Sequence, residues 1–402
     1  MTANVPGYLL SQLEASARQP VWIADNDQLA HYCQQWAELP LIALDTEFMR
    51  VDTFYPIPGL IQVADDHACY LIDPLSVTQM APFAALLADT RILKVLHASS
   101  EDLELFRHHY GVVPEPLLDT QVAAAFAGWG FSMGLQRIVE KALQISLGKG
   151  HTRSDWLQRP LSEEQIHYAA LDVAYLPAIA WQLKAELEQL GRYDWALDEC
   201  HLLSASSRDS DPQGTHYYQR FTQLNISSPV KLAGVRDLTA WREQACRKRN
   251  LCRPLVLKNE ALLKVIEAWP TSLAALDALG VLRRQNLKQD GQCILAILAN
   301  AERSAEQAPP APIHLPLHVY HSQTLKRLKA IGRDVAKQEQ IMPELLIRRR
   351  DLEKLINSKD AQGRHHLPET LQGWRKALIG DRLLAAVATP ENTQTQTQEN
   401  AC

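Results

Sequence analysis

The sequence contains no long run of apolar residues, no C-x-x-C pair and no glycine-rich phosphate loop. Because a membrane-spanning helix needs about 18 or more apolar residues, we expect no transmembrane segment. The seven cysteines form neither a disulfide framework nor a zinc-knuckle pattern, which favours reduced thiols. The missing G-x-x-x-x-G-K-[ST] motif argues against a helicase and predicts no nucleotide cofactor. The first 19 residues also lack the features of a signal peptide, so the expected location is cytoplasmic.

The chain has an uneven distribution of charge. Its 402 residues are 46% hydrophobic and carry a net charge of −5, which is typical of a globular protein. Residues 1–205 contain 12 Lys+Arg and 26 Asp+Glu, a net charge of −14, whereas residues 206–402 contain 29 and 20, a net charge of +9. An acidic half joined to a basic half indicates separate tasks, and the basic half could contact nucleic acid. An uneven but merely solvated surface would give the same counts.

Three stretches of low apolar content divide the chain. Residues 204–214 are small and polar, residues 306–312 are proline-rich, and residues 390–402 have almost no apolar side chains. These stretches predict domains at 1–203, 215–305 and 313–389, followed by a disordered tail at 390–402.

The first domain is expected to be α/β with a mixed sheet. Apolar runs at 39–45 and 92–97 predict buried strands, and residues 60–64 and 68–72 predict a β-hairpin. Helical patterns follow, the longest of them at 162–190 with a kink at Pro177. The other two domains are predicted to be small and all-helical. The third repeats the second at an offset of about 90 residues, as when Ile356 corresponds to Ile266.

Two acidic residues, Asp45 and Glu47, stand at the end of the first predicted strand. Residues i and i+2 of a strand point to the same face, so both carboxylates could bind one divalent cation. The Asp-x-Glu pattern also occurs at Asp351 and Glu353, where a solvated helix face is the simpler explanation. At Asp45 the context differs, because burying an unpaired carboxylate beside an apolar strand is costly.

Further candidates lie at two helices. Asp102 follows the predicted strand at 92–97 and falls in the first turn of the next helix, where compensation of the helix dipole is the alternative role. Tyr168 and Asp172 are four residues apart on the helix that begins with the Ser162–Gln165 capping box. This spacing places the phenol and the carboxylate on one helix face.

The order Asp-x-Glu, Asp, Tyr-x-x-x-Asp resembles the DEDD exonuclease superfamily, in its tyrosine subgroup. The segments 45–50, 96–103, 154–161 and 167–176 are similar to those of the ribonuclease D family in particular. The Trp241-Arg242-Glu243 segment and residues 290–295 resemble an HRDC domain (helicase and RNase D C-terminal). Residues 313–389 resemble a second, diverged HRDC domain that lacks this Trp-Arg-Glu signature. The resemblance implies an RNase H-like exonuclease domain followed by two helical domains.

The resemblance also implies a metal-dependent 3′→5′ exoribonuclease that releases 5′-mononucleotides and matures the 3′ ends of tRNA precursors and other structured RNAs. It implies two divalent cations, Mg²⁺ or Mn²⁺. The five residues implied to be catalytic are Asp45, Glu47, Asp102, Tyr168 and Asp172, of which the four carboxylates would be metal ligands. Tyr168 would orient or deprotonate the attacking water.

The basic half offers candidate phosphate contacts at Arg247, Lys248 and Arg249, although a solvated helix face is about equally compatible with this triplet. Two other functions remain open. A 3′→5′ DNA exonuclease would use the same carboxylates, and no motif here declares recognition of the 2′-hydroxyl group. The exonuclease fold could also be inactive and serve only to bind nucleic acid.

Overall fold

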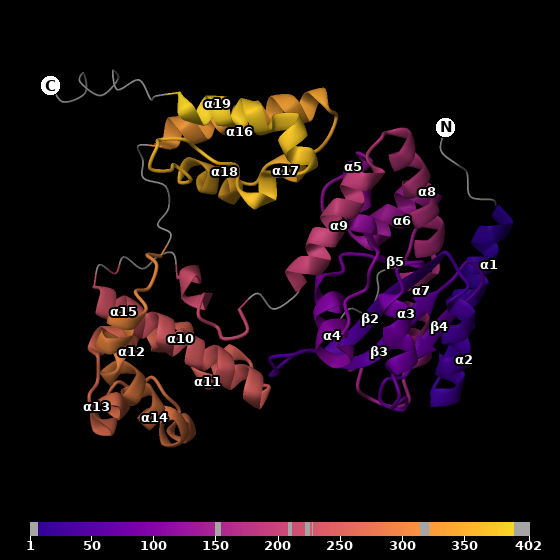
Figure 1. The fold of residues 1–402 in the computed structure, drawn as a ribbon. Helices are drawn as coiled ribbons and strands as arrows, with labels where there is room; N and C mark the ends of the chain where they lie inside the picture. Colours follow the sequence, from indigo (N-terminus) through magenta and orange to yellow (C-terminus); the bar gives the residue numbers. More distant parts are fainter. Residues whose placement is uncertain are drawn as a thin grey trace.

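A computed structural model describes residues 7–148, 154–207, 211–221, 226, 228–313 and 321–389 (Figure 1). The predicted disordered tail at 390–402 lies outside these residues. No helix in the described ranges combines the length and the apolar composition needed to cross a bilayer.

A six-stranded mixed sheet forms the centre of the first domain, with strand order β1-β4-β3-β2-β5-β6. The strands are β1 (Val21–Ile23), β2 (Leu41–Met49), β3 (Ile57–Ala64), β4 (Cys69–Ile72), β5 (Leu93–Leu96) and β6 (Leu117–Asp119). The β2–β3 and β3–β4 pairs are antiparallel, as the predicted hairpin requires, and the other neighbours are parallel.

Helices cover both faces of this sheet. They are α1 (Gly7–Arg18), α2 (Asn26–Trp36), α3 (Ala81–Ala88), α4 (Ser100–Tyr110), α5 (Thr120–Phe126), α6 (Leu135–Leu143), α7 (Glu163–Ala174), α8 (Leu176–Gln189) and α9 (Tyr193–Ser207). Ala43 of β2 packs into the core below α7 and α8, whereas its neighbour Leu44 packs into the core with α2, α3 and α4. Burial on both faces explains why β2 begins as a continuous apolar run.

Two sequence-based expectations need correction here. The helix predicted over 162–190 is two helices, α7 and α8, which meet at Tyr175 because Pro177 lies in the first turn of α8. The linker predicted from residue 204 begins later, since α9 continues to Ser207. Ser204 is buried, so tertiary packing outweighs the linker-like composition of this segment.

The remaining described residues form two helical domains. The first contains η1 (Tyr217–Arg220), α10 (Pro229–Arg249), α11 (Arg253–Val256), α12 (Asn259–Ala268), α13 (Leu273–Ala278), α14 (Arg284–Ala299) and α15 (Ala301–Gln307). The second contains α16 (Ser322–Gln338), α17 (Pro343–Leu346), α18 (Arg349–Ile356), η3 (Glu369–Leu371), η4 (Lys376–Gly380) and α19 (Asp381–Ala388). Helices α11 and α17 begin 90 residues apart, and so do α12 and α18, as the predicted repeat requires.

The second helical domain joins the catalytic domain through an aromatic contact. The ring of Trp374 stacks on Trp195 and meets Phe126 edge-on, with centroids 5.2 Å apart in both pairs. Arg375 forms a buried ion pair with Glu199 of α9. The core of this domain is therefore continuous with one of the two cores of the sheet.

The first helical domain contacts the loop between β2 and β3, which reaches out to α11 (Figure 1). The Oδ1 atom of Asn250 accepts hydrogen bonds from the backbone N–H groups of Phe54 and Tyr55, at 3.1 and 2.9 Å. The N–H group of Cys252 donates to the carbonyl of Asp52 at 2.8 Å. This domain is thus attached directly beyond the end of strand β2.

Candidate active site

Strand β2 positions the first two acidic residues. Asp45 pairs with Gln62 of β3 and Glu47 pairs with Leu60, in an antiparallel register that shifts just after Glu47. Asp45 and Glu47 therefore face α7 on the same side of the sheet, while Thr46 points to the opposite side. The i, i+2 spacing seen in the sequence produces this geometry.

Helix α7 brings the third carboxylate to the same place. The helix begins at a complete capping box between Ser162 and Gln165, which fixes its start and its rotation over the sheet. Asp45, Glu47 and Asp172 each offer an oxygen atom, and these atoms all lie within 4.8 Å of one another. Three converging carboxylates of this kind provide the hard oxygen ligands that Mg²⁺ and Mn²⁺ prefer.

Asp102 approaches from the first turn of α4 and is not part of this group of three. It is 7% exposed, and its Oδ1 accepts a hydrogen bond of 2.5 Å from the hydroxyl of Thr46. Asp102 is close enough to the group for its charge to raise the pKa values of both Asp45 and Glu47. Thr46 thus links the strand of the first motif to the helix of the second.

The turn before α4 is held by a buried network around Asp119. Its carboxylate accepts hydrogen bonds from the backbone N–H groups of Ala98 and Ser99, at 3.1 and 2.9 Å, and from the Ser99 hydroxyl at 2.9 Å. Ala98 has a φ of 55°, an uncommon conformation for a residue with a Cβ atom. These bonds stabilise the turn that delivers Asp102 to the site.

The clustered carboxylates hold their protons unusually tightly. Burial and the neighbouring acidic charges raise the pKa of Glu47 to about 8 and that of Asp45 well above its usual range. Burial raises the pKa values of Asp102 and Asp172 to about 7, although hydrogen bonds from Thr46 and Tyr168, respectively, act in the opposite direction. This excess of negative charge fits a site whose stable ionised form contains cations.

Tyr168 lies one helical turn before Asp172 and near the ring of Trp156, with centroids 6.1 Å apart. Burial and the charges of Asp172 and Glu47 raise the pKa of its phenol far above the usual range. The hydroxyl therefore stays protonated at neutral pH. It is suited to donate or orient a hydrogen bond rather than to act as a strong base.

The three basic candidates in α10 have different surroundings. Arg249 forms a two-pronged ion pair with Asp290, at 2.6 and 2.9 Å. The guanidinium of Arg247 lies over the ring of Phe54, 5.1 Å from its centroid, and Lys248 is exposed. A role of this triplet in binding nucleic acid stays a prediction.

Sequence analysis missed three residues that structure the site: Thr46, Asp119 and Gln62. Gln62 is fully buried, and neither atom of its amide has a hydrogen-bond partner among the residues that the structure describes. It stands directly opposite Asp45 in the sheet register. A polar residue in an otherwise apolar strand was the only signal in the sequence, and it does not reveal which residue lies opposite.

Comparisons with known proteins agree with this arrangement. Residues 20–188 match the family described as 3′-5′ exonuclease, residues 231–298 match the HRDC domain, and residues 320–383 match the ribonuclease D C-terminal HRDC domain. The chain is 41% identical over 370 residues to Ribonuclease D of Pseudomonas paraeruginosa, covering 91% of this chain and 97% of that protein. It is 38% identical over 369 residues to Ribonuclease D of Escherichia coli K12, covering 90% and 96%.

Solved structures give the same result. The crystal structure of E. coli RNase D, described as an exoribonuclease involved in structured RNA processing, matches with a TM-score of 0.83 and 37% identity over 92% of this chain and 98% of that one. The catalytic core of RRP6 from Trypanosoma brucei shares the fold, with a TM-score of 0.54 and 22% identity over 71% of this chain and 80% of that one. The predicted fold class is confirmed. With an exonuclease domain followed by two HRDC domains, the chain belongs to the ribonuclease D family of 3′→5′ exoribonucleases.

Proposed function

We propose that Asp45, Glu47 and Asp172 hold one divalent cation, that Asp45 also binds a second, and that Asp102 supports the second one. The convergence of three carboxylate oxygens within 4.8 Å is the observation that carries this proposal. Two Mg²⁺ or Mn²⁺ ions bound there would supply a lowered pKa for the attacking water and positive charge beside the leaving oxygen of an in-line displacement at phosphorus.

Tyr168 acts on the attacking water in this proposal. Its raised pKa keeps the phenol protonated, so the hydroxyl orients the water by hydrogen bonding. The hydrogen bonds of Thr46 and of the Asp119 network hold Asp102 in place while successive nucleotides are removed. The products are 5′-mononucleotides, released one at a time from the 3′ end.

We propose structured RNAs, and tRNA precursors in particular, as the natural substrates. The support for this is the family of the chain and its likeness to an E. coli enzyme described as processing structured RNA. The cytoplasmic location expected from the sequence agrees with such substrates and stays a prediction.

The test uses RNA and DNA oligomers of one sequence, labelled at either end, with Mg²⁺, with Mn²⁺ or with a chelator. We expect the 3′ label to leave at once as a mononucleotide, while the 5′-labelled strand shortens stepwise. DNA should be degraded more slowly, and the chelator should stop both reactions. Equal rates on DNA and RNA would favour the DNA exonuclease alternative, and degradation in the chelator would refute the cation site.

Substrate choice needs a separate comparison. We expect a tRNA precursor with a 3′ extension to be trimmed faster than an unrelated hairpin with the same extension. Asp45→Asn protein serves as the control for contaminating nucleases. Equal trimming of both RNAs would leave the exoribonuclease intact and remove the preference for tRNA precursors.

A further inference from the structure

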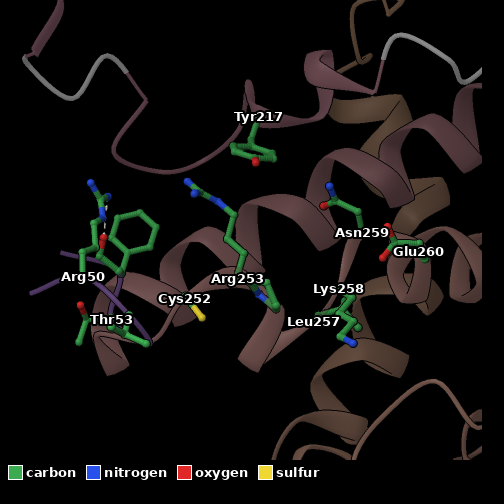
Figure 2. A pocket seen from close by; sticks show the side chains of 12 residues that line it. Arg50, Thr53, Tyr217, Cys252, Arg253, Leu257, Lys258, Asn259 and Glu260 are labelled. Atoms are coloured by element: carbon green, nitrogen blue, oxygen red, sulfur yellow. Dashed lines mark hydrogen bonds between the residues drawn. The ribbon is translucent and has the colours of Figure 1, made fainter. Parts of the chain in front are cut away.

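Two cavities open at the contact between the β2–β3 loop and the first HRDC domain. One has a volume of about 530 Å³ and is seen in Figure 2. The other has a volume of about 450 Å³. Phe54, Tyr217 and Arg253 line both cavities and form the wall between them. We call the two together the joint cavities.

Positive charge gathers at this wall around a single carboxylate. Glu243 is 1% exposed and receives two hydrogen bonds of 2.7 Å from Arg253. Arg242 and Arg247 lie 3.6 and 3.7 Å from the same carboxylate. Three guanidinium groups therefore share one buried negative charge, which leaves an excess of positive charge.

The residues that line the joint cavities also carry a net positive charge. It contains six cations, Arg50, Arg107, Arg220, Arg247, Arg253 and Lys258, against four carboxylates, Glu104, Asp211, Glu243 and Glu260. This surplus contrasts with the net charge of −14 carried by residues 1–205. In addition, the buried Nε atom of Arg107 has no hydrogen-bond acceptor in the described part of the chain. A polyanion would be attracted here and repelled by most of the catalytic domain.

Two of these cations are well placed to meet a ligand. Arg220 is exposed and lines one cavity, where its guanidinium lies over the ring of Tyr217, 4.8 Å from the centroid. Lys258 is exposed and lines the other cavity. Neither side chain takes part in an ion pair between described residues, so either can be changed without leaving a buried charge unpaired.

The joint cavities are linked along the chain to residues of the catalytic site. Arg50 follows Glu47 by three residues, and its guanidinium lies 3.7 Å from Glu101, the neighbour of Asp102 in α4. Arg50 is held in this place by two hydrogen bonds to Glu104, at 2.8 and 3.2 Å. Each cavity thus includes a residue within three positions of a catalytic carboxylate, Arg50 in one and Ser100 in the other.

We propose that the joint cavities form a phosphate-binding subsite for single-stranded RNA upstream of the scissile bond, shared by the catalytic domain and the first HRDC domain. This inference rests on the proposed function. Lys258 and Arg220 contact successive phosphates on either side of the Phe54–Arg253–Tyr217 wall. Such contacts position the strand without reading its sequence. Glu260 opposes the binding of phosphate in the cavity that contains Lys258.

The test compares charge changes inside and outside the cavities in the full-length enzyme. The test variant is Arg220→Gln with Lys258→Gln. The control is Lys264→Gln with Lys288→Gln, which removes the same charge from exposed positions of the same domain that line neither cavity. Steady-state kinetics are measured on an unstructured oligonucleotide of about 16 residues and on a dinucleotide, across a salt series. Thermal unfolding verifies that all variants fold.

We expect the test variant to raise KM for the long oligonucleotide about tenfold, with kcat unchanged and the dinucleotide unaffected. The slope of log KM against the logarithm of salt concentration should fall by about 0.7 for each phosphate that is no longer neutralised. The control should change KM less than twofold, and Glu260→Gln should lower it. Equal effects in the test and control variants, or an equally raised KM for the dinucleotide, would overturn the subsite.

The same measurements separate this inference from the proposed function. If the unmodified enzyme degrades no RNA from its 3′ end, the proposed function fails. The subsite is then tested by binding of the long oligonucleotide to Asp45→Asn protein with the same substitutions added. An unchanged affinity in that background would refute the subsite by itself.

Discussion

The molecule contains two clusters of like charge that are handled in opposite ways. At the active site, carboxylates gather with no cationic side chain among the residues that raise or lower their pKa values. At the contact with the first HRDC domain, guanidinium groups gather around Glu243, which neutralises part of their charge. The charge of the acidic cluster is thus left for metal ions to neutralise. The charge of the basic cluster is partly neutralised by a side chain of the protein itself.

The two HRDC domains also differ in how they contact the catalytic domain. The second is fixed to the catalytic domain by stacked tryptophans and a buried ion pair, and its core is continuous with that of the sheet. The first touches the catalytic domain through the backbone of the β2–β3 loop and around the joint cavities. A cavity of about 530 Å³ also lies at the contact of the second domain. The two contacts therefore differ in the continuous apolar core, which only the second domain shares with the sheet among the described residues.

The largest effect should come from neutralising one member of the acidic cluster. Asp45→Asn should lower the rate of hydrolysis by at least about a thousandfold, roughly 4 kcal/mol of transition-state stabilisation. Because the substitution also relieves repulsion among the carboxylates, the protein without metal should unfold at the same or a higher temperature. Single-turnover rates and calorimetry measure the two effects. Full activity at ordinary Mg²⁺ concentration would contradict the role of Asp45.

Removal of the Tyr168 hydroxyl should have the next largest effect. Tyr168→Phe should slow the chemical step by about 10²-fold, within the usual range for a positioned proton-transfer group. The ring still packs near Trp156, so metal and RNA binding should be retained. Unchanged single-turnover rates would make Tyr168 an ordinary core residue.

In the basic cluster, removing the charge of Glu243 should lower stability, whereas removing the charge of Asp45 should not. Glu243→Gln leaves three guanidinium groups without their shared carboxylate and should destabilise the protein by about 3 kcal/mol. Denaturant unfolding of this variant and of Asp45→Asn gives the comparison directly. If both substitutions shift stability in the same direction, the contrast between the two clusters is wrong.

Gln62 allows a finer test of the acidic cluster. Replacing a buried, unpartnered amide with an apolar side chain of similar size should stabilise the protein by about 1 kcal/mol. Gln62→Leu should nevertheless lower activity about tenfold and raise the Mg²⁺ concentration for half-maximal rate, because an apolar side chain opposite Asp45 disfavours the ionised form of its carboxylate. Greater stability with unchanged activity would limit Gln62 to packing.

The last prediction concerns pH in the absence of metal. The folded-state pKa values of Glu47, about 8, and of Asp102 and Asp172, about 7, exceed those of about 4 in an unfolded chain. The folded protein thus binds more protons than the unfolded one, and this contribution to stability is full below about pH 4 and is lost as the pH rises through 7 to 8. Melting temperatures in chelator should fall across this range, and less so for Asp45→Asn. A rise instead would contradict the raised pKa values.

The sequence identified the parts of the site that depend on local spacing. Asp45 and Glu47 are two residues apart on a strand, Tyr168 and Asp172 are four apart on a helix, and both spacings place their side chains on one face. Strand β1 and strand β6 were missed because each has only three residues and pairs in parallel with a distant strand.

Contacts between distant segments could not be predicted. The position of Gln62 opposite Asp45 depends on strand register, and the pairing of Arg249 with Asp290 depends on how α10 packs on α14. A basic triplet therefore suggests a phosphate-binding surface in the sequence, although two of its members, Arg247 and Arg249, have carboxylate partners in the fold. Asp119 caps the start of α5, a role that its place before this helix indicates, but its bonds to Ala98 and Ser99 about 20 residues earlier could not be predicted.

The β2–β3 loop belongs to two environments at once, since it continues the strand that carries Asp45 and Glu47 and forms one wall of the joint cavities. Cation binding and RNA binding therefore both depend on the conformation of this loop. By thermodynamic linkage, if RNA in the cavities changes cation affinity by some factor, the cation must change RNA affinity by the same factor. Where this factor exceeds one, the enzyme acquires its metal most readily when a strand is present to be cut. Idle protein, in contrast, would exchange its ions with the surrounding solution.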